Sequence, residues 1–214
     1  AGDHKQYWHL YSMMIHYCLI IALFATGGLI ALMPQINQLL FKTRAGSPAI
    51  AVEMVAIVFA ALINCYASVL QTSGRLNPLA LSIGLGLLTK LVLNYWLVEQ
   101  FRIMGASIGS VCALAVMALG CWKALPQNGH HKESGFFVEL VFVTIVMMVV
   151  AWLTAHGLEA VVGNSRLSEI VVVSFAVIVG VIVALTLTIA SHLLTDEELT
   201  MIPGFSNLLS RRKE

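Results

Sequence analysis

Leu81–Val98 reads LSIGLGLLTKLVLNYWLV, an apolar run long enough to cross a bilayer, and it carries one basic residue, Lys90, near its middle. A charged side chain at the centre of a membrane costs roughly 2.5–3.5 kcal/mol on insertion scales, so such residues usually face a polar interior, a pairing partner or a substrate pathway. Lys90 is the only basic residue inside a long apolar segment of this chain. The run therefore predicts a transmembrane helix whose cation faces a polar interior, a pairing partner or a substrate pathway.

The composition of the whole chain agrees with a membrane protein. Hydrophobic residues make up 59% of the sequence and charged residues 11%, and the mean hydropathy is +0.88. Soluble domains carry roughly 25% charged residues, and about 20 apolar residues span the hydrocarbon core as a helix. We therefore predict an all-α, polytopic protein with six transmembrane helices, over Leu10–Phe41, Pro48–Gln71, Pro78–Val98, Ile103–Leu125, Phe136–Leu158 and Leu167–Leu194.

The basic residues between the spans predict the orientation. With six spans both termini lie on one side, which carries Lys5, Arg75, Lys123, Lys132, Arg211, Arg212 and Lys213. The opposite side carries fewer basic residues, namely Lys42, Arg44, Arg102 and Arg166. Lys and Arg accumulate in cytoplasmic loops. We therefore expect both termini of this segment in the cytoplasm, and the loops with fewer basic residues on the outer side.

The spans divide into two groups. Residues 1–125 contain four helices, a cytoplasmic loop with His130 and His131 follows at 126–135, and a trailing helix pair occupies 136–194. Residues 195–214 predict a cytoplasmic amphipathic tail that begins with a capping box. In the first span, Pro34 predicts a helix that is kinked or broken there. The start at Ala1, which leads at once into a span, suggests a piece of something longer.

Four polar residues inside the spans are candidates for lining a substrate cavity: Lys90, Asn94, Glu53 and Asn64. Lys90 and Asn94 are four residues apart and share a helix face. Lys90 lies about 12 Å and Glu53 about 8 Å below the outer ends of their spans. These depths allow an ion pair between them, while Lys90 could also snorkel to an interface or meet an anionic ligand in a cavity. Asn64 and Asn94 could instead be interhelical hydrogen-bonding residues.

Several functions have no support in the sequence. Cys18, Cys65, Cys112 and Cys121 lie inside apolar runs without the spacing of metal ligands, so they are expected to be packing residues. No Ser/His/Asp set, phosphate-binding glycine loop or carboxylate pair is present, and no basic aromatic patch suggests a nucleic acid. We expect no enzyme activity, no cofactor, no bound metal and no nucleic-acid partner.

An ordered series of short motifs resembles a known family. It consists of GLIALMPQINQLLF at Gly28–Phe41, LQTSGR at Leu70–Arg75, Lys90-x-x-x-Asn94-Tyr95-x-Leu97-Val98, and GASIGS at Gly105–Ser110. The series is similar to polysaccharide biosynthesis proteins of the SpoVB/YtgP type, in the multidrug/oligosaccharidyl-lipid/polysaccharide (MOP) exporter superfamily. Each motif alone is weak, and their order over nearly the whole chain is more specific.

The resemblance implies the C-terminal part of a MATE-like flippase. Such proteins have fourteen helices in two lobes and move undecaprenyl-linked sugars, such as lipid II, across the bacterial inner membrane. This chain would supply four helices of the C-terminal lobe and the trailing pair, and its partners would be membrane lipids, the lipid-linked oligosaccharide and the absent N-terminal lobe. Two alternatives remain: an ion-coupled multidrug antiporter that uses Glu53, and a non-transporting membrane scaffold subunit in which Lys90 serves packing.

Overall fold

The computed structural model describes residues 2–125, 134–162 and 166–190, and these ranges contain helices and no strand. Six stretches within them are long and apolar enough to cross a membrane, with α2 and α3 together forming one. The predicted all-helical, six-span architecture is therefore confirmed. The helices are α1 (Gly2–Phe41), α2 (Ser47–Met54), α3 (Ala56–Thr72), α4 (Leu76–Phe101), α5 (Ile103–Ala124), α6 (Ser134–Val162) and α7 (Arg166–Ala190). The predicted loop at 126–135 lies almost entirely, and the predicted tail at 195–214 entirely, outside the described residues.

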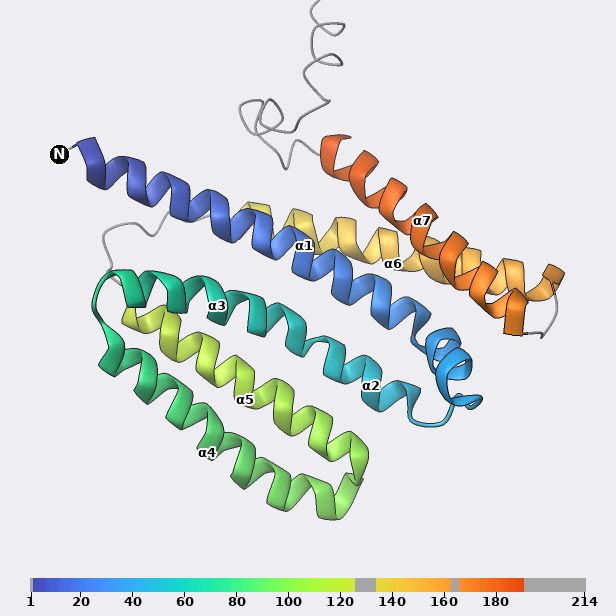
Figure 1. Ribbon diagram of the computed structural model, residues 1–214, viewed down its shortest axis with the longest axis horizontal. Coiled ribbons are helices and arrows are strands. Elements are labelled where there is room, and N and C mark those ends of the chain that lie inside the picture. The colour runs from blue at the N-terminus through green and yellow to red at the C-terminus, as the bar shows by residue number, and fades with distance from the viewer. Residues whose placement is uncertain (1, 126–133, 163–165, 191–214) are drawn as a thin grey trace, which may run out of the picture.

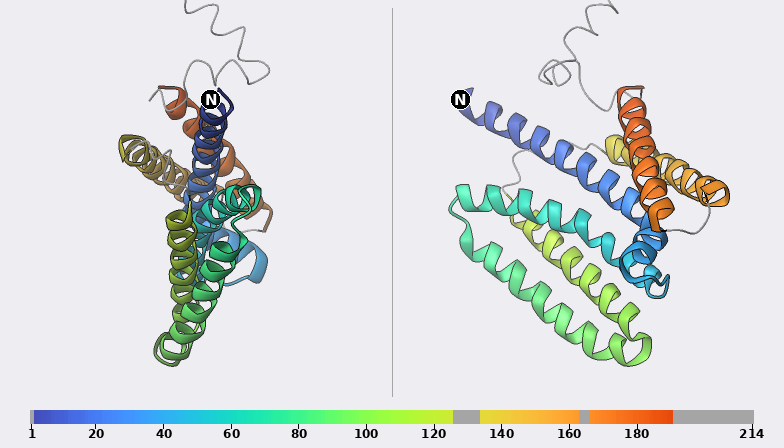
Figure 2. Two further views of the ribbon diagram at one scale, coloured as in Figure 1. Left: turned by 90° about the vertical axis from the view of Figure 1, so that its left-hand side faces the viewer. Right: turned by 45° about the vertical axis from the view of Figure 1, so that its right-hand side comes forward.

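Helix α1 is the central element (Figure 1). On one side it packs against α2 and α3, which in turn pack on α5, and α4 lies against α5 as the outermost helix. On its other side α1 packs against α6 and α7, which also pack against each other. The views in Figure 2 show the same order, with α1 between the two groups. We call the end of the bundle with residues 42–46 and Arg102 the Arg102 end, and the opposite end the Arg75 end.

Both faces of α1 are buried by apolar side chains. Toward the Arg75 end, Leu19 and Ile20 form a buried cluster with Leu140 and Val143 of α6. Further along, Ala31 and Leu32 pack with a set of small residues from α6 and α7, namely Ala151, Ala155, Val172 and Ala176. Small side chains bring helix axes close together, which is how helices associate where the surrounding lipid offers no hydrophobic driving force. The trailing pair is thus joined to the rest of the chain through α1.

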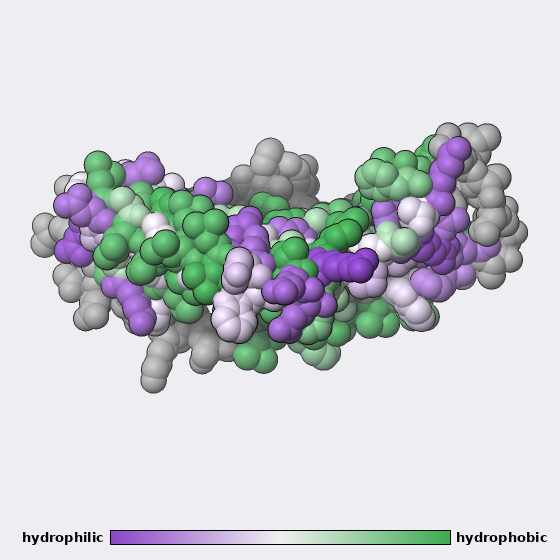
Figure 3. Space-filling view, turned by 90° about the horizontal axis from the view of Figure 1, so that it is seen from below, coloured by the Kyte–Doolittle hydropathy of each residue, from purple (hydrophilic) through white to green (hydrophobic). Residues whose placement is uncertain are grey.

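The outer surface of the bundle is apolar. On α4, Leu81, Leu91 and Tyr95 are 66%, 69% and 78% exposed. Figure 3, which views the molecule from below α4 and α5, shows hydrophobic residues over much of this face, with hydrophilic residues in separate patches. A soluble protein rarely exposes contiguous apolar surface of this extent. The exposed leucines and aromatics are the surface expected of helices in contact with lipid.

Pro34 does not break α1. The helix runs without interruption from Gly2 to Phe41 with Pro34 inside it, so of the two predicted outcomes the broken helix is wrong. In Figure 1 the last turns of α1 change direction relative to the rest of the helix. Such a bend is expected because proline has no N–H to donate and its ring crowds the preceding turn.

The second span contains a break that the sequence does not indicate. Val55 separates α2 from α3, and the N–H groups of Val55 and Val58 donate to carbonyls only three residues earlier. The Met54 carbonyl accepts a hydrogen bond from the hydroxyl of Thr26 on α1, at 3.3 Å. No glycine or proline lies near this point. A contact with another helix therefore accompanies the break, and such a contact is invisible in the local sequence.

The connection between α4 and α5 is a very tight hairpin. Arg102 alone connects the helices, with a positive φ of 51°. Gly105 lies so close to α4 that a Cβ there would be 2.1 Å from the carbonyl oxygen of Leu97. Helix α5 has a small-residue face, which is buried and consists of Gly105, Ser107, Gly109 and Ser110.

The close contact at Gly105 makes a stability prediction. We expect Gly105→Ala to lower the free energy of unfolding by about 1–3 kcal/mol, because backbone atoms on both sides have to move apart. Gly84→Ala is the matched control, because nothing lies within 4 Å of a Cβ at Gly84, and alanine there is expected to be neutral or stabilising. Thermal unfolding of the purified full-length protein in detergent measures both. Equal midpoints for the two variants would contradict the close packing of this hairpin.

Candidate functional site

The exposed face of α3 is polar. Within this helix the exposed residues are Asn64, Ser68, Gln71 and Thr72, whereas every apolar residue is buried or half-buried. Spacings of four and three residues place Asn64, Ser68 and Gln71 on one face. Polar groups in a spanning helix favour contact with protein or a watery cavity over contact with acyl chains. This polar stripe, Asn64–Ser68–Gln71, therefore marks a side of the bundle that is unsuited to lipid.

The side chains of the stripe differ in how much hydrogen-bonding capacity they keep. The Ser68 hydroxyl donates to the carbonyl of Asn64 at 2.9 Å, and the Thr72 hydroxyl donates to the carbonyl of Ser68 at 3.0 Å. These hydroxyls are thus bonded to their own helix. In the described part of the chain the Asn64 side-chain amide has no such bond. Asn64 and Gln71 are the members of the stripe whose side-chain amides remain available to a ligand or a partner helix.

Lys90 lies deep within its helix and is exposed. It is about 16 Å from the Phe101 end of α4 and about 21 Å from the Leu76 end, at a rise of about 1.5 Å per residue. Its side chain is exposed, and no carboxylate among the described residues forms an ion pair with it. A lysine side chain spans only part of these distances, so its ammonium group does not easily reach either membrane surface. The structure thus presents an unpaired cation in the middle of a span.

Asn94 shares a face with Lys90, as the sequence predicts, and lies in the seam between α4 and α5. It is half-buried, and its Oδ1 atom is buried without a hydrogen-bond partner among the described residues. Gly109 makes room for this amide, because a Cβ at Gly109 would be 2.3 Å from Oδ1. The glycine of the small-residue face therefore has a second effect: it fixes where the amide of Asn94 lies relative to Lys90.

Glu53 is not brought to Lys90. It is half-buried on the last turn of α2, beside the break at Val55. Helix α2 packs against α1 and α5, whereas α4 packs chiefly against α5. The ion pair that the depths of the two residues allow is not formed in this structure, because depth along a span says nothing about which helices are neighbours. Lys90 and Asn94 thus form one group, while Asn64 and Glu53 lie on other helices.

The sequence analysis overlooked three polar residues that the structure sets apart. Ser68 and Gln71 extend the stripe from Asn64, and their spacing of four and three residues could have revealed them. Thr26 holds the Met54 carbonyl at the break, for which no local signal exists. No group of three or more His, Cys, Asp or Glu side chains that could hold a metal ion gathers within the described ranges.

Comparisons with known proteins place this geometry on a known fold. No model of a known protein family matches the chain. The chain is 29% identical over 201 residues to YabM, an uncharacterized membrane protein of Bacillus subtilis (strain 168); the match covers 92% of this chain and 38% of that protein. The fold is similar to that of the lipid II flippase MurJ in an inward closed conformation, with a TM-score of 0.67 and 13% identity over 87% of this chain and 39% of that one.

The chain matches only part of each of these two proteins. The chain spans about two fifths of the length of both proteins. The structural likeness shows that the helices have the arrangement found in part of the MurJ structure. The six long apolar helices are those of a multi-pass membrane protein.

The polar stripe leads to a labelling prediction. In the full-length protein, cysteines introduced as Asn64→Cys and Ser68→Cys are expected to react with a membrane-impermeant thiol reagent, because thiols react as thiolates and these require water. Leu88→Cys, on an exposed apolar position of α4, is the matched control and is expected to stay unlabelled. The native cysteines are replaced in all variants. Labelling of Leu88→Cys at the same rate as the other two would contradict a wet face on α3.

Proposed function

We propose that this chain is the C-terminal part of a membrane transporter that flips an undecaprenyl-linked oligosaccharide or lipid II across the bacterial inner membrane. The observation that carries the proposal is Lys90, exposed in the middle of a span of a flippase-like fold and without an ion-pair partner in the described part of the chain. A protein of this kind has to offer polar, cationic surface to a pyrophosphate-sugar head group while the lipid tail remains in hydrocarbon. The proposal assigns the chain to the SpoVB/YtgP type of the MOP superfamily.

We propose the following arrangement of the spans, the loops and the termini in the membrane. Residues 1–125 form the four transmembrane spans of the C-terminal lobe, with α2 and α3 together as one span, and residues 136–194 form the trailing pair. The loop at 126–135 and the tail at 195–214 lie on the cytoplasmic side together with both termini of the segment. The Arg102 end then faces outward. The N-terminal lobe of the same protein closes the cavity from the opposite side and is the chain's principal protein partner.

In this mechanism Lys90 is the group that attracts the anionic head. Its ammonium donates hydrogen bonds to phosphate oxygens, and such charge-assisted bonds are stronger than neutral ones. The amide of Asn64 on α3 contacts the polar head group, and half-buried Asn94, whose Oδ1 is buried beside Gly109, has its NH2 group left to donate to the same head group. Glu53 lies near the break between α2 and α3 and adjusts the charge of the cavity from a distance. No covalent step is required, because transport depends on a change in which side of the membrane the cavity faces.

Replacing Lys90 tests the proposal. In the full-length protein Lys90→Ala is expected to lower the flipping rate in reconstituted vesicles by about tenfold to a hundredfold, which corresponds to the loss of a hydrogen bond to a charged group. Lys90→Arg keeps the charge and is expected to retain much of the activity. Lys123→Ala, an exposed lysine at the end of α5, is the matched control. Wild-type flipping and normal surface polymer with Lys90→Ala would refute the role of this cation.

Glu53 separates this proposal from ion-coupled antiport. A multidrug antiporter needs an intramembrane carboxylate that binds the coupling cation, and Glu53 is the carboxylate of the four-helix group that lies within a span. If the chain belongs to a flippase, Glu53→Gln is expected to change flipping severalfold at most. Loss of cation-driven efflux of small organic cations with Glu53→Gln would instead favour the antiporter.

A further inference from the structure

The trailing pair is held to the rest of the chain unevenly. Near the middle of α1 the contact with α6 is tight, because a Cβ at Gly27 would lie 2.8 Å from Cγ2 of Thr144. Between α1 and α7 the packing is interrupted by an open apolar cavity of about 440 Å³. Its walls come from three helices and include Gly28 and Leu32, Ala151, and Val177 and Gly180. Beside this cavity, Ala31 and Leu32 of α1 remain packed against small residues of α6 and α7, so the packing of the trailing pair on α1 is incomplete rather than absent.

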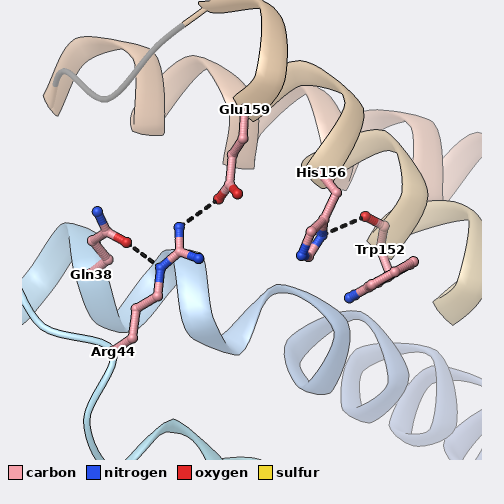
Figure 4. Close-up of polar contacts among 5 residues, drawn as sticks. All are labelled: Gln38, Arg44, Trp152, His156 and Glu159. Carbon is pink, nitrogen blue, oxygen red and sulfur yellow. Dashed lines mark hydrogen bonds and ion pairs between the residues drawn. The ribbon is translucent and has the colours of Figure 1, made fainter.

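One ion pair joins the loop at residues 42–46 to α6 at the Arg102 end. The Nη2 atom of Arg44 donates to Oε1 of Glu159 at 3.1 Å, and the Arg44 Nε donates to the side-chain oxygen of Gln38. Figure 4 shows the guanidinium between these two partners, one on α1 and one on α6. The Glu159 side chain is only 19% exposed, so water competes with Arg44 less than at a fully open surface. The pair therefore links the two groups of helices directly.

The other polar side chain on this face of α6 is occupied elsewhere. The ring of His156 stacks on Trp152 with centroids 4.3 Å apart, and its Nδ1 atom lies 3.1 Å from the Trp152 carbonyl oxygen. His156 thus lies along its own helix rather than toward the loop (Figure 4). Glu159 is the group that this face presents to Arg44.

The loop that carries Arg44 is itself fixed. The side-chain amide of Asn37, which is 2% exposed, donates to the carbonyl of Ala45 at 2.9 Å and to the hydroxyl of Ser47 at 3.0 Å. The Ser47 hydroxyl donates in turn to the carbonyl of Arg44 at 2.8 Å. Because Ala45 and Ser47, which follow the arginine, are both bonded to Asn37 near the end of α1, the loop is held in place there. The ion pair with Glu159 therefore fixes the position of α6 relative to α1, and not only relative to the loop.

A buried amide below the ion pair opposes the docked arrangement. Gln35 is 1% exposed, and neither of its amide atoms has a partner among the described residues. It follows Ala31 by four residues and Leu32 by three, so it shares the face of α1 that packs against α6 and α7. Burying an unpaired amide is unfavourable. The docked position of the trailing pair thus combines a stabilising ion pair with a destabilising amide.

We propose that the Arg44–Glu159 pair is a latch that holds the trailing helices α6 and α7 against α1 at the Arg102 end, and that these helices move away from α1 there when the pair opens. Toward the Arg75 end the contact persists through the cluster around Leu19 and Leu140 and the stacking of His16 on Phe136. The motion is therefore a pivot about the Arg75 end. The latch goes beyond the proposed transport activity and does not depend on the identity of the substrate.

Hydrogen–deuterium exchange of the full-length protein in nanodiscs tests the latch. Arg44→Gln and Glu159→Gln are each expected to raise amide exchange about two- to fivefold in the last turns of α1 and in the end of α6 around Glu159, the size expected for one exposed ion pair. The reversed pair Arg44→Glu with Glu159→Arg is expected to restore slow exchange. Gln35→Leu, which removes the unpaired amide and keeps the volume similar, is expected to shift exchange in the opposite direction.

Controls at the same end of the bundle make the outcome decisive. Glu99→Gln and Arg102→Gln change exposed charges outside the latch and are expected to leave exchange in α1 and α6 at the wild-type level. Exchange in Arg44→Gln and Glu159→Gln that matches these controls would overturn the proposal. Failure of the reversed pair to restore slow exchange would also overturn it, because the effect would then come from the individual side chains. The readout does not involve transport and is independent of the proposed function.

Discussion

The hydrocarbon core offers no hydrogen-bond partners and no solvent for charge, and this constraint organises the whole chain. It forces the backbone into long helices, whose N–H and C=O groups are satisfied internally. It also allows large apolar side chains on the outside of the bundle, as on α4. Under the same constraint every polar group within a span has to be bonded, buried against another helix or directed at water. The few polar residues of this protein therefore carry most of the information about its function.

These residues meet the constraint in different ways. Thr26 is bonded to the Met54 carbonyl of a broken helix, and Ser68 is bonded to its own helix. Asn94 is enclosed in the α4–α5 seam by Gly109. Lys90 is neither bonded nor enclosed among the described residues. In the proposed function this cation faces a polar space, which would satisfy it without a partner from the described helices.

Features set by local patterns could be predicted from the sequence. The six spans follow from the apolar runs, and the shared face of Lys90 and Asn94 follows from their spacing of four residues. Features that depend on which helices are neighbours could not be predicted. The break at Val55 accompanies a bond from another helix, and Glu53 is apart from Lys90 because α2 packs on α1 and α5. The depth of a residue in the membrane can be counted along the sequence, whereas the sequence does not show which helices pack side by side.

The central claim is that the ammonium group of Lys90 faces water inside the complete protein. An experimental structure of the full-length protein in a lipid nanodisc tests it most directly. The account predicts that the Lys90 Nζ atom lies within about 2.7–3.2 Å of water, of a phosphate oxygen or of a polar group of the facing lobe, inside a cavity that the α3 stripe also borders. A Lys90 side chain lying among acyl chains on the outer surface of α4 would contradict the account.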